Sequence, residues 1–151
     1  IIPLVDFFAS GFDWKLNHEP APSGLIFFFA VSFMNGIVLE IGRKIKPPDY
    51  EEPGVLSYTF QLGTRRAVML WLGILLVTLV LAILASYVAE HDFYAYFALV
   101  LVFIICLIPA IMFLKHQTKR NAKLIEYSSA LWTFAMYLII GGIPMLISLL
   151  K

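Results

Sequence analysis

The sequence predicts an all-α protein built as a polytopic transmembrane helix bundle. Of its 151 residues, 61% are hydrophobic and 14% are charged, and the mean hydropathy is +0.88. Soluble domains are about half apolar and about one quarter charged, so this composition excludes an ordinary soluble domain. The net charge of +1 gives no indication of a nucleic-acid partner, and we expect none.

The apolar stretches have the length of membrane spans, because a helix needs about 20 residues to cross the hydrocarbon core. Four stretches are long enough, at residues 24–43, 67–89, 93–114 and 127–150. Residues 1–10 are apolar but too short to span, and they lack the features of a signal peptide. We expect them to be a partial helix that continues from a longer chain, and residues 1–151 to form a single transmembrane domain.

The basic residues predict how this bundle is oriented, because Lys and Arg accumulate in cytoplasmic loops. The loops at 44–66 and 115–124 are therefore expected in the cytoplasm and the C-terminus outside, in a bacterial or archaeal plasma membrane. Lys15 and Lys151 lie on the other side. Nine of the eleven basic residues lie in these two loops or, for Arg43, directly before the first loop. They are Arg43, Lys44, Lys46, Arg65, Arg66, Lys115, Lys119, Arg120 and Lys123.

Polar side chains concentrate at the end of the first complete span and in the loop after it. Glu40 lies where the span leaves the membrane and shares a helix face with Arg43 and Lys44, while Asn35 lies one turn deeper. Carboxylates at this point are suited to Mg²⁺, which binds a few carboxylates together with substrate phosphates, and Arg or Lys binds phosphate oxygens. The alternative is that Glu40 and Lys44 form only an ion pair at the membrane edge, with the basic residues setting topology.

The pattern in this window resembles a known family. It consists of Asn35, then Glu40, Gly42, Arg43 and Lys44, then a segment at 54–63 that ends in glycine, then Arg65 and Arg66 at the next span. This order is similar to the C-terminal half of the UbiA family of intramembrane prenyltransferases. The resemblance implies a nine-helix bundle around a cavity, of which this chain would supply the end of helix five and helices six to nine. The N-terminal half would be a partner.

The resemblance also implies an activity and a site. The reaction would transfer a polyprenyl group from its diphosphate to an aromatic or lipid-like acceptor at the cytoplasmic mouth, with Mg²⁺ as cofactor. The implied residues are Glu40 and Asp49 as catalytic residues and metal ligands, and Asn35, Arg43, Lys44, Tyr58 and Arg65 as substrate-binding residues. The family's second motif pairs two aspartates four residues apart, whereas this chain has Glu40 and Lys44 there.

Two other functions are compatible with the same residues. In a transporter or permease on a similar bundle, Asp6, Asn35 and Glu40 would line a path instead of a diphosphate site. In a non-catalytic membrane protein, the polar window would serve only to set topology.

Overall fold

The described chain is entirely helical apart from its connections. A computed structural model describes residues 24–51, 57–89 and 93–142, and within these ranges there is no strand. The elements in order are α2 (Leu25–Arg43), η1 (Pro48–Tyr50), α3 (Tyr58–Leu62), α4 (Thr64–Val88), α5 (Phe93–Lys115), α6 (Lys119–Tyr137) and η2 (Leu138–Gly142). The predicted all-α class is confirmed, while the predicted partial helix at 1–10 lies outside the described residues.

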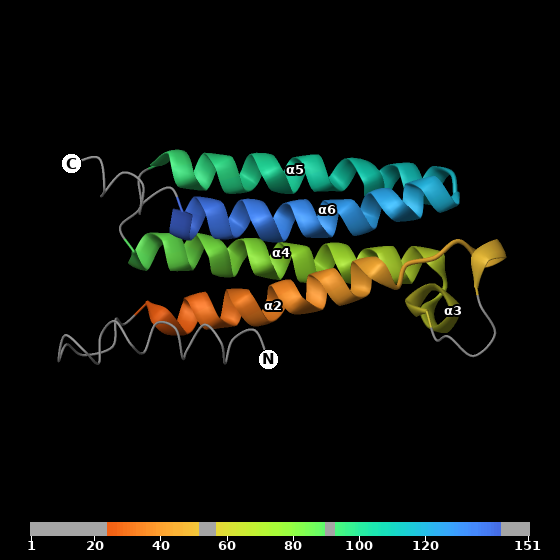
Figure 1. Cartoon of the computed structure of the whole chain (residues 1–151), viewed down its shortest axis with the longest axis horizontal. Helices are drawn as coiled ribbons and strands as arrows, with labels where there is room; N and C mark the ends of the chain where they lie inside the picture. The colour runs from red at the N-terminus through yellow and green to blue at the C-terminus, as the bar shows by residue number, and fades with distance from the viewer. Residues whose placement is uncertain (1–23, 52–56, 90–92, 143–151) are drawn as a thin grey trace.

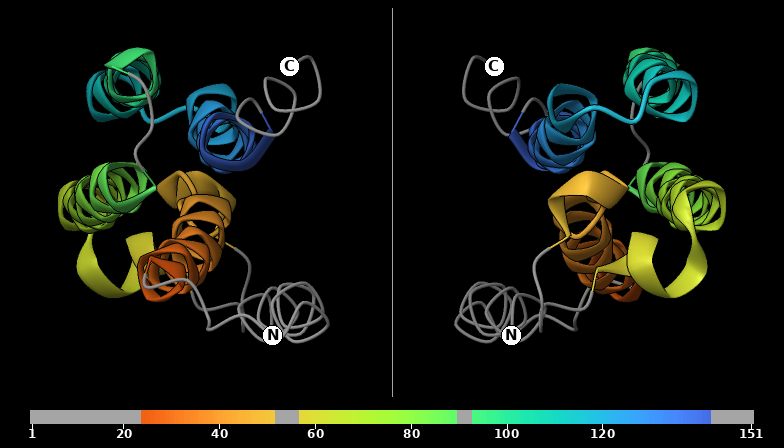
Figure 2. Two further views of the ribbon diagram at one scale, coloured as in Figure 1. Left: turned by 90° about the vertical axis from the view of Figure 1, so that its left-hand side faces the viewer. Right: turned by 90° about the vertical axis from the view of Figure 1, so that its right-hand side faces the viewer.

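The four long helices lie side by side and alternate in direction (Figure 1). Viewed along their axes they occupy the four corners of a bundle (Figure 2). α2 packs against α4 and α6, and α5 packs against the same two helices. The contacts therefore run in a ring, with α2 diagonally opposite α5 and α4 diagonally opposite α6.

Each long helix is long and apolar enough to cross a membrane: Leu25–Arg43, Thr64–Val88, Phe93–Lys115 and Lys119–Gly142. Their outward surfaces carry large apolar side chains, such as Ile104 and Ile108 on α5 and Leu76 and Val80 on α4, all half exposed or nearly so. An apolar surface on every side is what a bundle presents to lipid, because the hydrocarbon core is as apolar as these side chains. The architecture is that of a multi-pass integral membrane protein.

The basic connection predicted at 115–124 is wrong in its extent, since helix α6 already begins at Lys119. The helix starts there because the Thr118 side chain accepts a hydrogen bond from the Asn121 amide at 3.2 Å, which is N-capping. Asn121 also closes the turn: its Nδ2 donates to the carbonyls of Met112 and His116, at 3.2 and 2.7 Å. The basic residues from Lys119 onward are therefore on a helix. Residues 143–150 of the predicted fourth span lie outside the described part.

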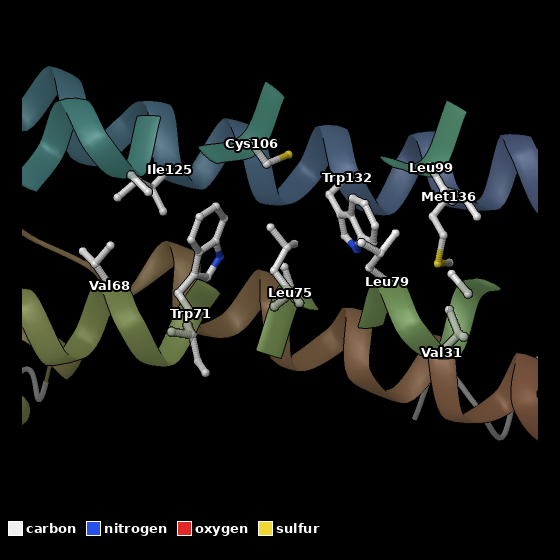
Figure 3. Packing of buried hydrophobic residues seen from close by; sticks show 14 of the residues in the cluster. Val31, Val68, Trp71, Leu75, Leu79, Leu99, Cys106, Ile125, Trp132 and Met136 are labelled. Carbon is white, nitrogen blue, oxygen red and sulfur yellow. The ribbon is translucent and has the colours of Figure 1, made fainter. Parts of the chain in front are cut away.

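The core lies between α2 and α4 on one side and α5 and α6 on the other, and its largest labelled side chains are two tryptophans (Figure 3). Trp71 on α4 and Trp132 on α6 are fully buried, together with Leu75 and Ile125. Cys106 is also fully buried, and its Sγ lies 3.5 Å from the Ser128 carbonyl oxygen. This packing fixes the relative positions of α2, α4 and α6, which carry most of the polar side chains described below.

Candidate functional site

Glu40 lies near the end of α2 and is held by two cations of its own helix. Its Oε2 lies 2.7 Å from Arg43 Nη2 and its Oε1 lies 2.7 Å from Lys44 Nζ. The pairs have helical spacings of three and four residues, so they follow directly from the sequence once the helix forms. All three side chains are substantially exposed. The ion pair that the sequence allowed as an alternative is present, and it fixes two cations at this end of the bundle.

Asp49 is separated from Glu40 by a break in the helix. α2 ends at Arg43, and Pro47 has an extended backbone before Pro48 begins the short η1. Proline at these positions cannot continue the helix, so Asp49 is presented from η1 as an exposed side chain. The structure places it at the same end of the molecule as Glu40, with no ion pair to any other described residue.

A Mg²⁺ ion held by Glu40 would compete with the two cations that this carboxylate already contacts. Each Glu40 oxygen has a cation at 2.7 Å, and these cations would repel a metal ion at the same carboxylate. Within residues 24–51, 57–89 and 93–142 no group of three or more His, Cys, Asp or Glu side chains is arranged to hold a metal.

The segment after α2 folds back onto the end of that helix. The Tyr58 amide donates to the Lys44 carbonyl oxygen at 3.2 Å, and the Lys46 amide donates to Thr59 Oγ1 at 3.2 Å. Ser57 caps α3 by accepting from the Phe60 amide at 3.0 Å. The described part of this loop contains the short helix α3, and Tyr58 lies half-buried at its start, next to Lys44.

Arg65 lies in the first turn of α4, which begins at the same end of the bundle as the candidate site. Gly63 joins α3 to α4 with φ +78°, a conformation that glycine adopts at no steric cost. Arg65 is exposed and lies at the same end of the bundle as the end of α2 (Figure 1). Of the predicted residues, the structure therefore brings Glu40, Arg43 and Lys44 into direct contact and links Tyr58 to Lys44.

Asn35 is not part of this exposed group. It is 1% exposed, near the middle of α2, and its Nδ2 donates to Met136 Sδ on α6 at 3.3 Å. Five residues separate it from Glu40, which rotates it by about 140° around a helix with 3.6 residues per turn. Its Oδ1 has no hydrogen-bond partner among the described residues. Asn35 therefore belongs to the interior of the bundle.

Replacing Asn35 with leucine is expected to leave the bundle as stable or to stabilise it by about 1 kcal/mol, because the change removes a buried acceptor that lacks a partner. Asn35→Asp is expected to destabilise it by about 3 kcal/mol, the order of cost for a carboxylate near the middle of a membrane. Unfolding in mixed micelles with increasing dodecyl sulfate measures both. A clear loss of stability in the leucine variant would indicate that Oδ1 has a stabilising partner.

Gly42 has a role that the sequence motif did not reveal. A Cβ at this position would overlap Ser129 Oγ of α6, and would lie 3.0 Å from Ser129 Cβ and 3.2 Å from Trp71 Nε1 of α4. Trp71 Nε1 donates to Ser129 Oγ at 2.9 Å, and Ser129 Oγ donates to the Ile125 carbonyl at 3.0 Å. Three helices thus meet at Gly42, two residues from Glu40. A glycine in an apolar helix is a sequence signal for such contact, but nothing in the sequence indicates Ser129 or Trp71 as its partners.

The remaining sequence predictions fall partly outside the described chain. Asp6, proposed for a transport path, and residues 52–56 of the loop are not among the described residues. Comparison of the chain with models of protein families, with curated proteins and with solved structures finds no match. The features that bear on function are therefore the geometry at the end of α2 and the residue pattern of the chain.

Proposed function

We propose that this chain is part of an intramembrane polyprenyl transferase of the UbiA kind, and that it binds the diphosphate of the donor where α2 ends. The observation that carries the proposal is the arrangement of Glu40 with Arg43 and Lys44, both at 2.7 Å. The acceptor would be an aromatic or lipid-like molecule that reaches the site from the bilayer. The N-terminal part of such a bundle would supply the rest of the cavity.

The chemistry assigned to these side chains is phosphate recognition. Arg43 offers a planar fork of donors that matches phosphate oxygens, and Lys44 offers a compact positive charge. As the bond to the allylic carbon breaks, negative charge accumulates on the leaving diphosphate, and cations already in place stabilise it without having to reorganise. Glu40 acts as a positioning residue, because it holds both cations against the end of α2 before substrate arrives.

The resemblance implies Mg²⁺ as a cofactor, and the contacts of Glu40 limit which groups could bind it. Mg²⁺ commonly binds through one or two carboxylates and substrate phosphates. With Glu40 engaged by two cations, any such ion would depend on carboxylates other than Glu40 and on the diphosphate itself. Phosphate binding through Arg43 and Lys44 requires no metal.

Binding of a polyprenyl diphosphate to the full-length protein tests the proposal. We expect Arg43→Gln and Lys44→Gln each to weaken binding by about tenfold, the order of a lost charged hydrogen bond. Glu40→Gln is expected to have a smaller effect, since it removes only positioning. Lys123→Gln is the matched control, because Lys123 is a basic residue at the same end with its own partner, Glu126, at 3.5 Å. Equal binding by wild type and by the Arg43 and Lys44 variants would contradict the proposal.

One observation favours the transporter alternative. The Asn35 carboxamide is buried between α2 and α6 with its oxygen unpaired, and polar groups inside a membrane bundle frequently mark substrate pathways. Reconstituted vesicles distinguish the two functions. Solute movement that is lost in Asn35→Leu, together with no release of diphosphate, would favour transport. Release of diphosphate without solute movement would favour the transferase.

A further inference from the structure

All charged side chains that the structure describes lie at one end of the bundle. In residues 24–51, 57–89 and 93–142 there are nine basic and four acidic residues, all at the end where α2 and α5 finish and α4 and α6 begin (Figure 1). The described parts of the helices toward the opposite end contain no Asp, Glu, Lys or Arg. The charge imbalance is therefore concentrated on one surface.

Four of these cations lie on the helix ends beside the connection between α5 and α6. A hydrogen bond of 3.2 Å from Thr64 Oγ1 to Gln117 Oε1 joins the start of α4 to the connection between α5 and α6. The cations around this bond, which we call the basic rim, come from three helices and are all exposed. The basic rim consists of Arg66, Lys115, Lys119 and Arg120.

The basic rim is not neutralised by the acidic residues of the same end. Glu40 is paired with Arg43 and Lys44, and Glu126 with Lys123. Within the described part of the chain, none of the four rim cations forms an ion pair. Lys119 Nζ lies 5.2 Å from the centre of the Tyr50 ring, which leaves its positive charge uncompensated. Asp49 and Glu51, on either side of Tyr50 in the sequence, are two carboxylates against four cations.

The depth of the basic rim is set by the apolar surface next to it. On α5 the exposed side chains of Ile111 and Met112 are followed by Lys115 within one turn, and on α4 Arg66 precedes the exposed Met69 within one turn. One turn of helix spans 5.4 Å. Both helices therefore pass from hydrocarbon-like to cationic surface over the distance that separates acyl chains from headgroup phosphates.

We propose that the basic rim binds the headgroups of anionic phospholipids in the leaflet that surrounds this end of the bundle. Charge complementarity identifies the partner, because clustered basic residues at the membrane edge attract negatively charged lipids. This surface lies outside the residues assigned to diphosphate binding, so the inference does not depend on the proposed function.

The test uses the whole protein reconstituted in vesicles with equal amounts of phosphatidylcholine and phosphatidylglycerol. Spin-labelled versions of each lipid report the fraction immobilised at the protein surface, and hence the ratio of their association constants. Replacing all four rim residues with glutamine is expected to lower the preference for phosphatidylglycerol by about fivefold or more, the factor for the attraction of even one basic residue. A variant with Arg66→Lys, Lys115→Arg, Lys119→Arg and Arg120→Lys keeps the charge and is expected to keep the preference.

A second measurement is independent of any variant. In the wild-type protein the preference is expected to fall as salt is raised, because exposed charges are screened over about 10 Å at 0.1 M ionic strength. If the preference for phosphatidylglycerol persists in the glutamine variant, or in wild type at high salt, the proposal is overturned. An acidic protein would then be the alternative partner of the basic rim. Loss in both the glutamine and the charge-keeping variants would also overturn it, since charge would then not be the cause.

Discussion

Replacing Gly42 with alanine is expected to destabilise the bundle by about 3 kcal/mol, toward the upper end of the range for overpacked cores. The added methyl group would overlap Ser129 Oγ and lie 3.0 Å from Ser129 Cβ. Neither contact can be relieved by a flexible side chain, because the Ser129 hydroxyl is itself bonded to Trp71 and to the Ile125 carbonyl. The helices α2 and α6 would have to move apart. Unfolding of the purified protein in mixed micelles measures the effect.

Gly36 provides the matched control for this prediction, since it lies on the same helix and an added Cβ would meet nothing within 4 Å. Gly36→Ala is expected to be neutral or slightly stabilising, because alanine has a better helix propensity than glycine. Adding Ser129→Ala to Gly42→Ala removes the most severe overlap and is expected to recover part of the lost stability. Equal stability of the Gly36 and Gly42 variants would show that α2 and α6 are not in close contact at this point.

The two buried tryptophans are expected to respond differently to the same substitution. Trp71 and Trp132 are both fully buried, but only Trp71 has a hydrogen-bond partner for its indole N–H within the described chain. Trp71→Phe is expected to cost about 2 kcal/mol, from lost volume and a lost hydrogen bond. Trp132→Phe is expected to cost about 1 kcal/mol or less, because it also removes a buried donor without a partner.

A double-mutant cycle with Ser129→Ala separates the hydrogen bond from the change in volume. The energies of Trp71→Phe and Ser129→Ala are expected to be coupled by about 1 kcal/mol, while Trp132→Phe and Ser129→Ala are expected to be nearly additive. If the Trp132 pair were coupled as strongly as the Trp71 pair, the assignment of the Ser129 hydroxyl to Trp71 would be wrong.

The ion pairs of Glu40 show which contacts can be predicted from the spacing of residues along the chain. Residues three and four apart on a helix are neighbours whatever surrounds them, so the contacts of Glu40 with Arg43 and Lys44 could be anticipated from the chain alone. The same rule gives no information on what lies across from a helix. For this reason the sequence pattern groups Asn35 with Glu40, whereas the structure places Asn35 inside the bundle, against Met136 on α6.

The sequence by itself determined the fold class, the number of apolar spans and the concentration of basic residues around two connections, because hydropathy and helix periodicity act over short distances along the chain. It also suggested the resemblance to prenyltransferases, and every site role that this resemblance implies, for Glu40, Arg43 and Lys44 as well as for Asp49, Tyr58 and Arg65, stays a prediction. Only the tertiary structure decided that Gly42, Trp71 and Ser129 form the junction of three helices. It also placed cations from α4, α5 and α6 together around the bond between Thr64 and Gln117. These residues are far apart in the chain, and packing between helices is what brings them together.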